Sequence, residues 1–359
     1  MKALFLDVTS SAREAGLHHV RDETPGISRK RQGRNFTYFD TKGQIIRQPE
    51  TLSRIKRLAI PPAWKNVWIC PQENGHLQAT GRDARGRKQY RYHSDWRKVR
   101  DETKYHAMIA FGRALPRLRG RVRRDMSRPG LSKKKILATV TRLLEITLIR
   151  VGNEEYAREN HSFGLTTLRD RHVQVKGGKV HFSFRGKSGK HHVIDVENRK
   201  LASLVRRCRD LPGQELFAYL DESGSPVKVT SADVNDYLQQ ITGQPFTARD
   251  FRTWAVTVLA AQALQGFEKF NSQTQAKQNM LSAIERVAGM LGNTPAICRR
   301  CYIHPVILET YLDGTLVERL KKIVEQKLTQ GMKRLRSDEA AVLMLLQQTM
   351  RPPSSRNHL

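Results

Sequence analysis

Cysteine and acidic residues are both scarce in this sequence. Only four cysteines occur among 359 residues, too few and too scattered for a disulfide framework in a chain of this size. Cys298, Cys301 and His304 have the spacing of part of a zinc site, but a closed site needs a fourth ligand and none is evident, so we expect free thiols. No cluster of Asp and Glu typical of catalytic magnesium is visible. We therefore expect neither a metal nor a cofactor.

Long hydrophobic runs are also missing. The most apolar stretch, residues 254–264, is interrupted by Thr257 and Gln262 and falls well short of the roughly 20 residues that a membrane-spanning helix needs. The first residues, with Ala3-Leu-Phe-Leu directly before Asp7, lack the apolar segment of a secretory signal. We expect a protein with no membrane partner that works in the cytoplasm.

The strongest compositional feature is an excess of positive charge. Lys and Arg number 64 against 34 Asp and Glu, which gives a formal net charge of +30 and a pI near 10.5. Such a chain attracts polyanions, because neutralisation of phosphates by Lys and Arg releases condensed counterions. A basic surface that is merely solvated has the same composition. Self-repulsion at this charge nevertheless favours a nucleic-acid partner that offsets it.

Residues 1–100 have the pattern of a small β-rich domain. Residues 35–40 and 67–70 are rich in residues that favour strands, and prolines and glycines punctuate the turns between them. At 38% hydrophobic residues, the whole chain is apolar and long enough for two domains with cores of their own.

Residues 77–92 are predicted to be two short strands joined by a basic turn. Basic side chains for phosphates and aromatic rings for sugars or bases suit a hairpin that contacts a duplex. A half-buried strand with a solvated turn predicts the same pattern, so both interpretations stay open. The residues concerned are Arg85, Arg87, Lys88, Tyr90 and Tyr92.

Residues 101–350 are predicted to form a larger, mainly helical domain, followed by a flexible tail at 351–359. Residues 136–150 place apolar side chains on one face, which predicts a helix that ends at Arg150. Residues 113–135 carry ten Lys and Arg against a single acidic residue and include a Pro-Gly pair. This composition favours a basic connector that lies near the nucleic acid.

One β segment interrupts the helices at residues 172–196. Its alternating runs predict two successive hairpins, the first closed by a Gly-Gly pair and the second by a turn with Lys187 at its tip. Gly186-Lys187-Ser188 has part of the phosphate-binding P-loop pattern, but that motif needs glycine where this chain has His181. It also needs a strand that leads into a helix, so we exclude a nucleotide site. The fold class is therefore α+β, with a three-stranded hairpin sheet in the helical part.

A predicted helix start places two arginines together. Residues 231–240 are predicted to be a helix closed by Gly243, and Thr247-Ala-Arg-Asp250 then has the pattern of a capping box. Arg249 and Arg252 fall in the first turn of this second helix, where backbone N–H groups also favour anions.

A second helix start leads to a tyrosine. Thr294-Pro295 is a cap followed by proline, with Asn293 just outside the helix and Tyr302 about two turns along, beside two arginines. A tyrosine at helical spacing is by default packed in a core. The basic character of the whole chain favours a nucleophile at this position instead.

Taken in order, these segments resemble the type IB DNA topoisomerases of the small bacterial and poxvirus kind. The resemblance runs from about residue 26 to about residue 314, and six motifs in order are more specific than any one of them. They are Gly81-Arg-Asp-Ala-Arg-Gly-Arg-Lys-Gln-Tyr90, Arg150-Val-Gly-Asn-Glu-Glu-Tyr156, Gly164-Leu-Thr-Thr-Leu168, Phe184-Arg-Gly-Lys187, Asp250-Phe-Arg-Thr-Trp254 and the segment around Tyr302.

The resemblance implies a role for each matching position. Tyr302 is the expected nucleophile, Arg150 and Arg252 the expected phosphate-binding arginines, and Lys187 the expected hairpin lysine. The fifth catalytic position, a histidine in the poxvirus and eukaryotic enzymes, is Asn293 here. Asn can donate a neutral hydrogen bond but cannot titrate, so proton transfer by this position is in doubt.

The resemblance also implies the partner. A monomer would clamp one DNA duplex between a DNA-binding N-terminal domain and a helical catalytic domain, in the bacterial cytoplasm at the nucleoid. The residues expected to contact DNA are Arg85, Arg87, Lys88, Gln89, Tyr90, Tyr92 and Arg249.

The residue types fit this chemistry on their own terms. A phenol with a pKa near ~10 is a poor nucleophile at neutral pH unless cations stabilise the phenolate, which two arginines that clamp a phosphate can do. As the resemblance implies, Lys187 would protonate the leaving 5′ oxygen, and attack would leave a 3′-phosphotyrosyl bond. The nicked strand then swivels and is resealed without ATP or metal.

Two other functions compete with this interpretation. A tyrosine recombinase or integrase shares the catalytic fold and the nucleophile but usually carries His three residues before the second arginine, where this chain has Arg249. A non-catalytic, basic architectural protein that binds DNA accounts for the charge. It does not account for chemically competent residues at every matched position.

Overall fold

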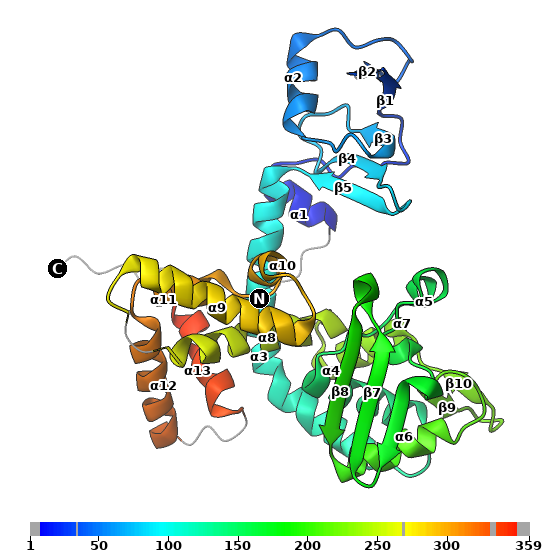
Figure 1. Ribbon diagram of the computed structural model, residues 1–359, viewed down its shortest axis with the longest axis vertical. Coiled ribbons are helices and arrows are strands. Elements are labelled where there is room, and N and C mark those ends of the chain that lie inside the picture. The colour runs from blue at the N-terminus through cyan, green and yellow to red at the C-terminus, as the bar shows by residue number, and fades with distance from the viewer. Residues whose placement is uncertain (1–7, 34, 268–269, 331–334, 350–359) are drawn as a thin grey trace. The chain divides into compact units, whose positions relative to one another are not determined.

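The structure is a computed structural model that describes residues 8–33, 35–267, 270–330 and 335–349. The chain divides into two compact units, residues 1–107 and 108–359 (Figure 1). The amino-terminal segment before Asp7 and the tail predicted at 351–359 both lie outside the described residues. Within the described ranges, no helix is long and apolar enough to cross a membrane.

The first unit is built on a five-stranded antiparallel sheet with the strand order β2-β1-β3-β4-β5. A cluster of buried Ile, Val and Ala side chains between the sheet and helix α2 forms its core. The guanidinium of Arg54 on α2 donates to Cys70 O at 2.6 Å and to Gln78 Oε1 at 3.0 Å, which fastens the helix to β3 and β4. The elements are α1 (Val8–Glu14), β1 (Ile27–Gln32), β2 (Asn35–Phe39), α2 (Pro49–Arg57), β3 (Lys65–Ile69), β4 (Leu77–Arg82) and β5 (Lys88–Tyr92).

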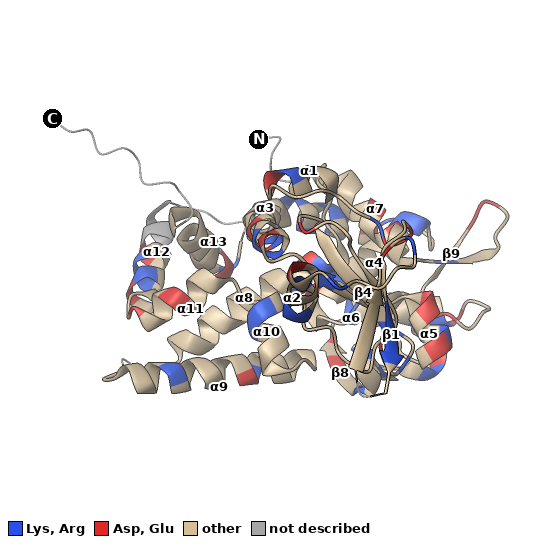
Figure 2. Cartoon of the chain, turned by 90° about the horizontal axis from the view of Figure 1, so that it is seen from above, with Lys and Arg blue, Asp and Glu red and all other residues tan. Residues whose placement is uncertain are grey.

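Strand β1 is the part of this sheet that the sequence did not predict. Its residues are Ile-Ser-Arg-Lys-Arg-Gln, of which only Ile27 is apolar and buried, so it lacks the alternation that marks a half-buried strand. The strand is held by pairing with β2 over five residue pairs and with β3 over two. Figure 2 colours the Lys and Arg positions of this strand blue. The strands predicted at 35–40 and 67–70 and the hairpin at 77–92 are present.

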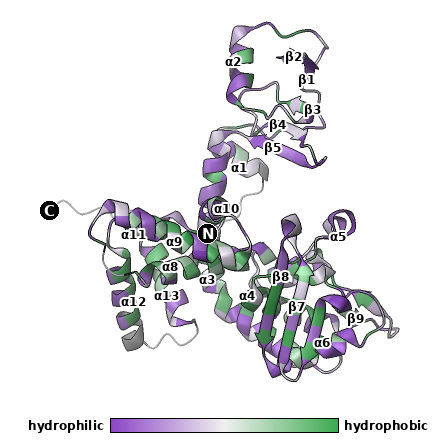
Figure 3. Ribbon diagram, viewed as in Figure 1, coloured by the Kyte–Doolittle hydropathy of each residue, from purple (hydrophilic) through white to green (hydrophobic). Residues whose placement is uncertain are grey.

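The second unit is mainly helical and contains the small sheet β6-β7-β8. Helix α6 packs against β6 and β7, and Figure 3 shows hydrophobic residues on this sheet and on α4 and α8. The elements are α3 (Ser94–Met126), α4 (Lys133–Thr147), α5 (Glu154–Asn160), η2 (Leu165–Thr167), η3 (Asp170–His172), β6 (Val173–Lys176), β7 (Lys179–Arg185), η4 (Lys187–Gly189), β8 (His191–Glu197), α6 (Arg199–Arg209), β9 (Ala218–Leu220), β10 (Pro226–Lys228), α7 (Ser231–Thr242), α8 (Ala248–Gln265), α9 (Gln273–Leu291), α10 (Pro295–Cys301), α11 (Pro305–Leu312), α12 (Leu316–Gln330) and α13 (Ser337–Thr349).

The basic connector predicted at residues 113–135 is wrong. Residues up to Met126 continue helix α3, which begins at Ser94 in the first unit, and only a short turn containing Pro129-Gly130 separates α3 from α4. Between the charged residues, large apolar side chains form one buried face of the helix. Leu115, Leu118 and Val122, which lie among these basic residues, are all at most 2% exposed. Burial of this face stabilises a helix that the charge count did not reveal.

Helix α4 also ends earlier than predicted. It stops at Thr147 because Leu148 adopts a left-handed conformation with φ 55°, and the Leu148 N–H bonds to Leu144 O as a helix cap. Arg150 therefore lies in the loop after the helix. The two hairpins predicted between 172 and 196 are present, with Lys187 in the turn between β7 and β8.

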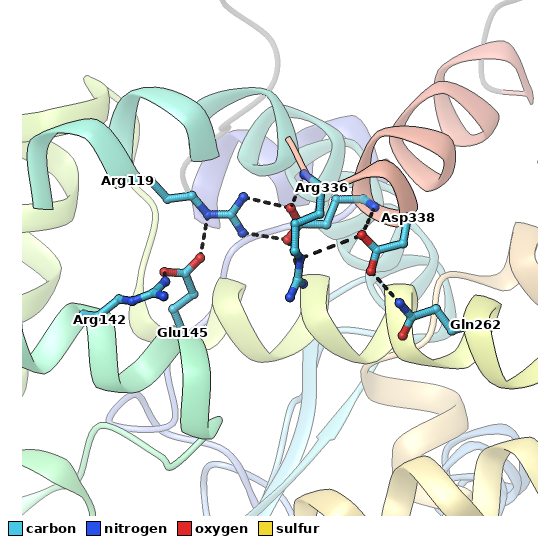
Figure 4. Close-up of polar contacts among 7 residues, drawn as sticks. Arg119, Arg142, Glu145, Gln262, Arg336 and Asp338 are labelled. Carbon is cyan, nitrogen blue, oxygen red and sulfur yellow. Dashed lines mark hydrogen bonds and ion pairs between the residues drawn. The ribbon is translucent and has the colours of Figure 1, made fainter. Parts of the chain in front are cut away.

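A network of ion pairs and hydrogen bonds around the buried Glu339 joins α3, α4, α8 and α13 (Figure 4). Arg119 on α3 donates two hydrogen bonds to the carboxylate of Glu339 on α13, at 2.7 and 2.8 Å, and a third to Glu145 on α4 at 2.6 Å. Gln262 on α8 donates to Asp338, next to Glu339. The Glu339 side chain is only 1% exposed, so its charge depends on these partners.

We expect Glu339→Gln to destabilise the second unit by about 3 kcal/mol, because Arg119 then keeps only Glu145 as a charged partner. Burial raises the pKa of Glu339, but the contacts with Arg119 outweigh it and the folded pKa lies below the ordinary 4.5. A lowered carboxylate pKa means that the stabilisation is complete above pH 4.5 and is lost as pH falls through the folded value. Thermal melts of both proteins at pH 7 and at progressively lower pH measure this difference.

The matched control is Glu318→Gln. Glu318 pairs with Lys322 at 2.9 Å on the exposed surface of α12, where an ion pair contributes less than about 1 kcal/mol. If the Glu339→Gln protein has a melting temperature at pH 7 no lower than that of the Glu318→Gln protein, the network does not contribute the stability predicted for it.

Candidate active site

Arg252 lies where three helices of the second unit meet. It is the fifth residue of α8, one position beyond the predicted first turn, and the capping box is formed by Asp250 accepting from Thr247 N at 2.7 Å. The guanidinium is 5% exposed and donates to Leu148 O, beyond α4, and to Leu291 O, at the end of α9, at 3.4 Å. Its Nε has no hydrogen-bond partner among the described residues. A buried charge is therefore fixed in place while its Nε donor remains unused by any residue that the structure describes.

Arg150 is positioned by a close contact between two stretches of backbone. Leu165 N donates to Arg150 O at 2.9 Å, and Thr166 N donates to Val151 O at 2.7 Å. Gly164 makes this approach possible, because a Cβ there would lie only 2.5 Å from Arg150 O and 2.6 Å from Gly152 Cα. The sequence motif at 164–168 therefore supports the loop that carries Arg150.

Asn293 contacts Arg150 directly. Helix α9 ends at Leu291 and is capped by Gly292, which has φ 63°. In the next residue, Asn293, the side-chain Oδ1 accepts a hydrogen bond from Arg150 Nη2 at 2.7 Å. The Nδ2 group of Asn293 is buried and has no partner within the part of the chain that the structure describes. Asn293 thus orients the guanidinium of Arg150, and its neutral Nδ2 donor remains unused within the described ranges.

Tyr302 follows the short basic helix α10, visible in Figure 2, and is its C-cap residue. The expectation that it lies inside the helix is wrong by one residue, because Pro305 begins α11 three positions later. Helix α8 fixes the tyrosine backbone, since Thr257 Oγ1 donates to Tyr302 O at 3.0 Å and accepts from His304 N at 3.1 Å. The guanidinium carbon of Arg252 lies 5.6 Å from the centre of the tyrosine ring.

Cys298 and His304, which have the spacing of part of a zinc site, pack or cap helices instead. Cys298 is buried within α10, and His304 caps α11 through Nδ1, which accepts from Val306 N at 3.2 Å. Among the described residues, no three His, Cys, Asp or Glu side chains come together as a possible metal site.

Lys187 enters the same site from the hairpin turn. It begins the turn between β7 and β8, in which Ser188 adopts a left-handed conformation with φ 63°, and its side chain is exposed. A pocket in the second unit is lined by Lys187 together with Arg150, Arg252 and His192. The structure therefore brings all five positions expected from the resemblance into one region.

The charges of the site alter the acidity of the phenol. Burial raises the pKa of Tyr302, but the positive charges of Arg252 and Arg150 outweigh burial, and the pKa lies below the ordinary value of 10. Burial, followed by the like charge of Arg150, lowers the pKa of Arg252 to about 10, so this guanidinium stays charged at neutral pH. Exposed Arg249, expected to contact DNA, also lowers the tyrosine pKa. The site thus favours both a phenolate and a bound anion.

The basic hairpin of the first unit presents one exposed face. Lys88, Tyr90 and Tyr92 alternate with less exposed residues on β5, and the two tyrosine rings stack with centroids 6.0 Å apart. Asp83 orders the turn, because its carboxylate accepts from Arg87 Nε at 2.8 Å and from Gln89 Nε2 at 3.0 Å. Arg85 is exposed in the turn itself.

Sequence reasoning missed three contributors to the site. In the sequence, Thr257 only interrupts an apolar stretch. A polar residue on the buried face of a helix is nevertheless a sign that its side chain bonds to another segment, here the backbone of Tyr302. His192 faces the pocket because β8 alternates and places it with Ile194, a period-two pattern present in the sequence. Gly164 belongs to a matched motif, but its role in letting the backbone approach Arg150 depends on a tertiary contact that the sequence does not show.

The chain resembles known proteins over most of its length. Residues 93–330 match the family described as "Eukaryotic DNA topoisomerase I, catalytic core", and residues 35–83 match "Bacterial DNA topoisomerase IB, N-terminal domain". The chain is 32% identical over 295 residues to "DNA topoisomerase 1B" of Acanthamoeba polyphaga mimivirus, covering 80% of this chain and 87% of the relative. It is 26% identical over 313 residues to "DNA topoisomerase 1" of Rabbit fibroma virus (strain Kasza), covering 81% and 94%. It is 22% identical over 245 residues to "DNA topoisomerase 1B" of Vaccinia virus (strain Copenhagen), covering 67% and 74%.

Proposed function

We propose, from the premise that this chain belongs to the type IB DNA topoisomerase family, that its reaction is carried by Tyr302, Arg150, Arg252, Lys187 and Asn293. The protein is a DNA topoisomerase, an isomerase that binds DNA and changes its supercoiling. The observation that best supports these residue assignments is the phenol of Tyr302 with its pKa lowered beside two arginines. Buried donor atoms with no partner among the described residues, Arg252 Nε and Asn293 Nδ2, lie in the same site.

The first step is binding of one backbone phosphate. Burial and then the like charge of Arg150 lower the pKa of Arg252, and a phosphate bound between the two guanidinium groups offsets both effects. Asn293 Nδ2 supplies a neutral hydrogen bond to a non-bridging oxygen, while Asn293 Oδ1 keeps Arg150 oriented. Fixed donors of this kind stabilise the charge that builds up on a five-coordinate phosphorus.

The second step is displacement at phosphorus. Tyr302 Oη forms a bond to the phosphorus and loses its proton to solvent, while the bond from phosphorus to the 5′ oxygen breaks. Lys187 gives a proton to that leaving oxygen, which becomes a 5′ hydroxyl. The 3′ end stays joined to the enzyme as a phosphotyrosine. Rotation of the nicked strand about its partner, followed by the reverse displacement, changes the linking number without ATP or metal.

We also propose that one chain acts alone on one duplex. The exposed face formed by Lys88, Tyr90 and Tyr92 suits contacts to phosphates and sugars from the first unit, and Arg249 adds a basic group at the start of α8. The match of residues 35–83 to a bacterial N-terminal domain supports a bacterial enzyme that works on the nucleoid in the cytoplasm.

The experiment that tests the function combines two assays on the purified full chain. Plasmid of either supercoil sign is expected to relax in EDTA without ATP. A suicide DNA substrate is expected to leave a covalent adduct on a denaturing gel, with a free 5′ hydroxyl and with the nucleotide mapped to Tyr302. Loss of cleavage in EDTA contradicts the metal-free reaction. A requirement for two paired sites and a multimer indicates a recombinase instead.

A further inference from the structure

The ring of His192 is enclosed by the two segments that deliver Lys187 and Asn293. His192 lies on β8 opposite Phe184 of β7, and the two rings stack with centroids 5.3 Å apart and planes inclined by 21°. It lines the same pocket as Lys187 and the two arginines. No step of the reaction described above uses this side chain.

Gly186 and Gly292 approach the ring so closely that a side chain on either would meet it. A Cβ on Gly186 would lie 2.6 Å from His192 Cδ2, and a Cβ on Gly292 would lie 3.0 Å from His192 Cε1. The φ of Gly186 is −100°, which any residue adopts, so the approach to the ring is what requires glycine there. Gly186 directly precedes Lys187, and Gly292 directly precedes Asn293.

We propose that His192 is a positioning residue whose ring, held between Gly186 and Gly292, sets the distance from the Lys187 turn to the pair formed by Arg150 and Asn293. The inference rests on the proposed role of Lys187 as the proton donor. The turn is closed by the hydrogen bond from Gly186 N to Lys190 O at 2.7 Å, which orders the turn but not its place beside α9.

The electrostatic state of the ring is consistent with a spacer. Burial, then the charges of Arg150 and Arg252, lowers the pKa of His192 below 6.5, so the ring is neutral at neutral pH. A neutral ring adds no third cation beside the phosphate-binding arginines. It therefore packs between the two segments without competing for the phosphate.

The test is His192→Ala, with cleavage of a suicide duplex measured against cleavage of the same duplex carrying a 5′-bridging phosphorothiolate. A displaced Lys187 is expected to slow cleavage of the ordinary phosphodiester about 10-fold to 100-fold. The phosphorothiolate, whose leaving group needs no proton, is expected to restore a rate close to that of the parent enzyme. Duplex binding and melting temperature are measured alongside.

Two further variants approach the same contact from other directions. Gly186→Ala places a methyl group against the His192 ring and is expected to give the same rescue by the phosphorothiolate. His191→Ala removes the neighbouring histidine, which is exposed and has its ring nitrogen near Ser183 Oγ at 3.3 Å, and is expected to cleave both substrates at the parent rate.

A double variant shows whether the effect passes through the lysine. Once Lys187→Ala has removed the proton donor, adding His192→Ala is expected to slow cleavage no further. Additive losses, or an equal defect on both substrates, overturn the positioning role and leave the proposed function intact. Failure of the parent protein to form an adduct at Tyr302 overturns the proposed function itself.

Discussion

Tyr302→Phe is expected to abolish the covalent protein–DNA adduct and plasmid relaxation, while duplex binding persists. The substitution removes the only atom that bonds to phosphorus in the proposed reaction, so the cleavage rate falls by at least about a thousandfold. The ring still packs beside Arg252, and the backbone of residue 302 still accepts the hydrogen bond from Thr257, so the fold is preserved. Denaturing gels report the adduct, and filter binding with the same duplex reports affinity.

Tyr156→Phe is the matched control for this substitution. Tyr156 is a well-exposed phenol on α5, within the second of the matched sequence motifs, and the proposed reaction does not use it. We expect this variant to relax plasmid at the parent rate. An adduct that still forms in Tyr302→Phe places the nucleophile at another residue.

Lys187→Ala has the second largest expected effect. Loss of a general acid slows strand cleavage by about 10²-fold to 10⁴-fold, because the 5′ oxygen then leaves as an alkoxide. A duplex with sulfur at the 5′ bridging position is expected to be cleaved at nearly the parent rate, since a thiolate leaves without a proton. Single-turnover cleavage of both substrates separates this chemical role from binding.

Lys190→Ala is the matched control for the lysine. Lys190 lies in the same turn, and its replacement by Ala removes the same charge. If the lysines act only by attracting DNA electrostatically, both variants slow cleavage alike. We expect the phosphorothiolate to distinguish them, with a large selective recovery only in Lys187→Ala. A Lys187→Ala enzyme that stays slow on the sulfur substrate excludes the lysine as the acid.

Local patterns predicted the elements whose stability is decided locally. The capping box before α8, the proline start of α10 and the hairpins around Lys187 all depend on residues adjacent in the chain, and all are present. The helix in place of the expected connector and strand β1 were missed for the opposite reason. Their stability comes from packing and pairing with distant segments, as with Phe111 against Phe246, which a charge count does not detect.

The candidate site was predictable in composition but not in geometry. The resemblance supplied the identities of the five residues, and the residue types explained why a phenol needs cations beside it. What the sequence could not show is that Asn293 holds Arg150, because the two residues are 143 positions apart. The close approach of Gly164 to Arg150 is equally a property of the folded chain.

Helix α8 carries both Arg252, whose guanidinium is proposed to bind the phosphate, and Thr257, which holds the backbone of Tyr302. The two residues are five positions apart on one helix, roughly 7.5 Å along its axis. A shift of α8 therefore moves the Arg252 guanidinium together with the hydroxyl group that holds the Tyr302 backbone. We therefore expect the broken end to meet the same spacing of Arg252 and the Tyr302 backbone on resealing that it had at scission, however many turns the DNA has made in between.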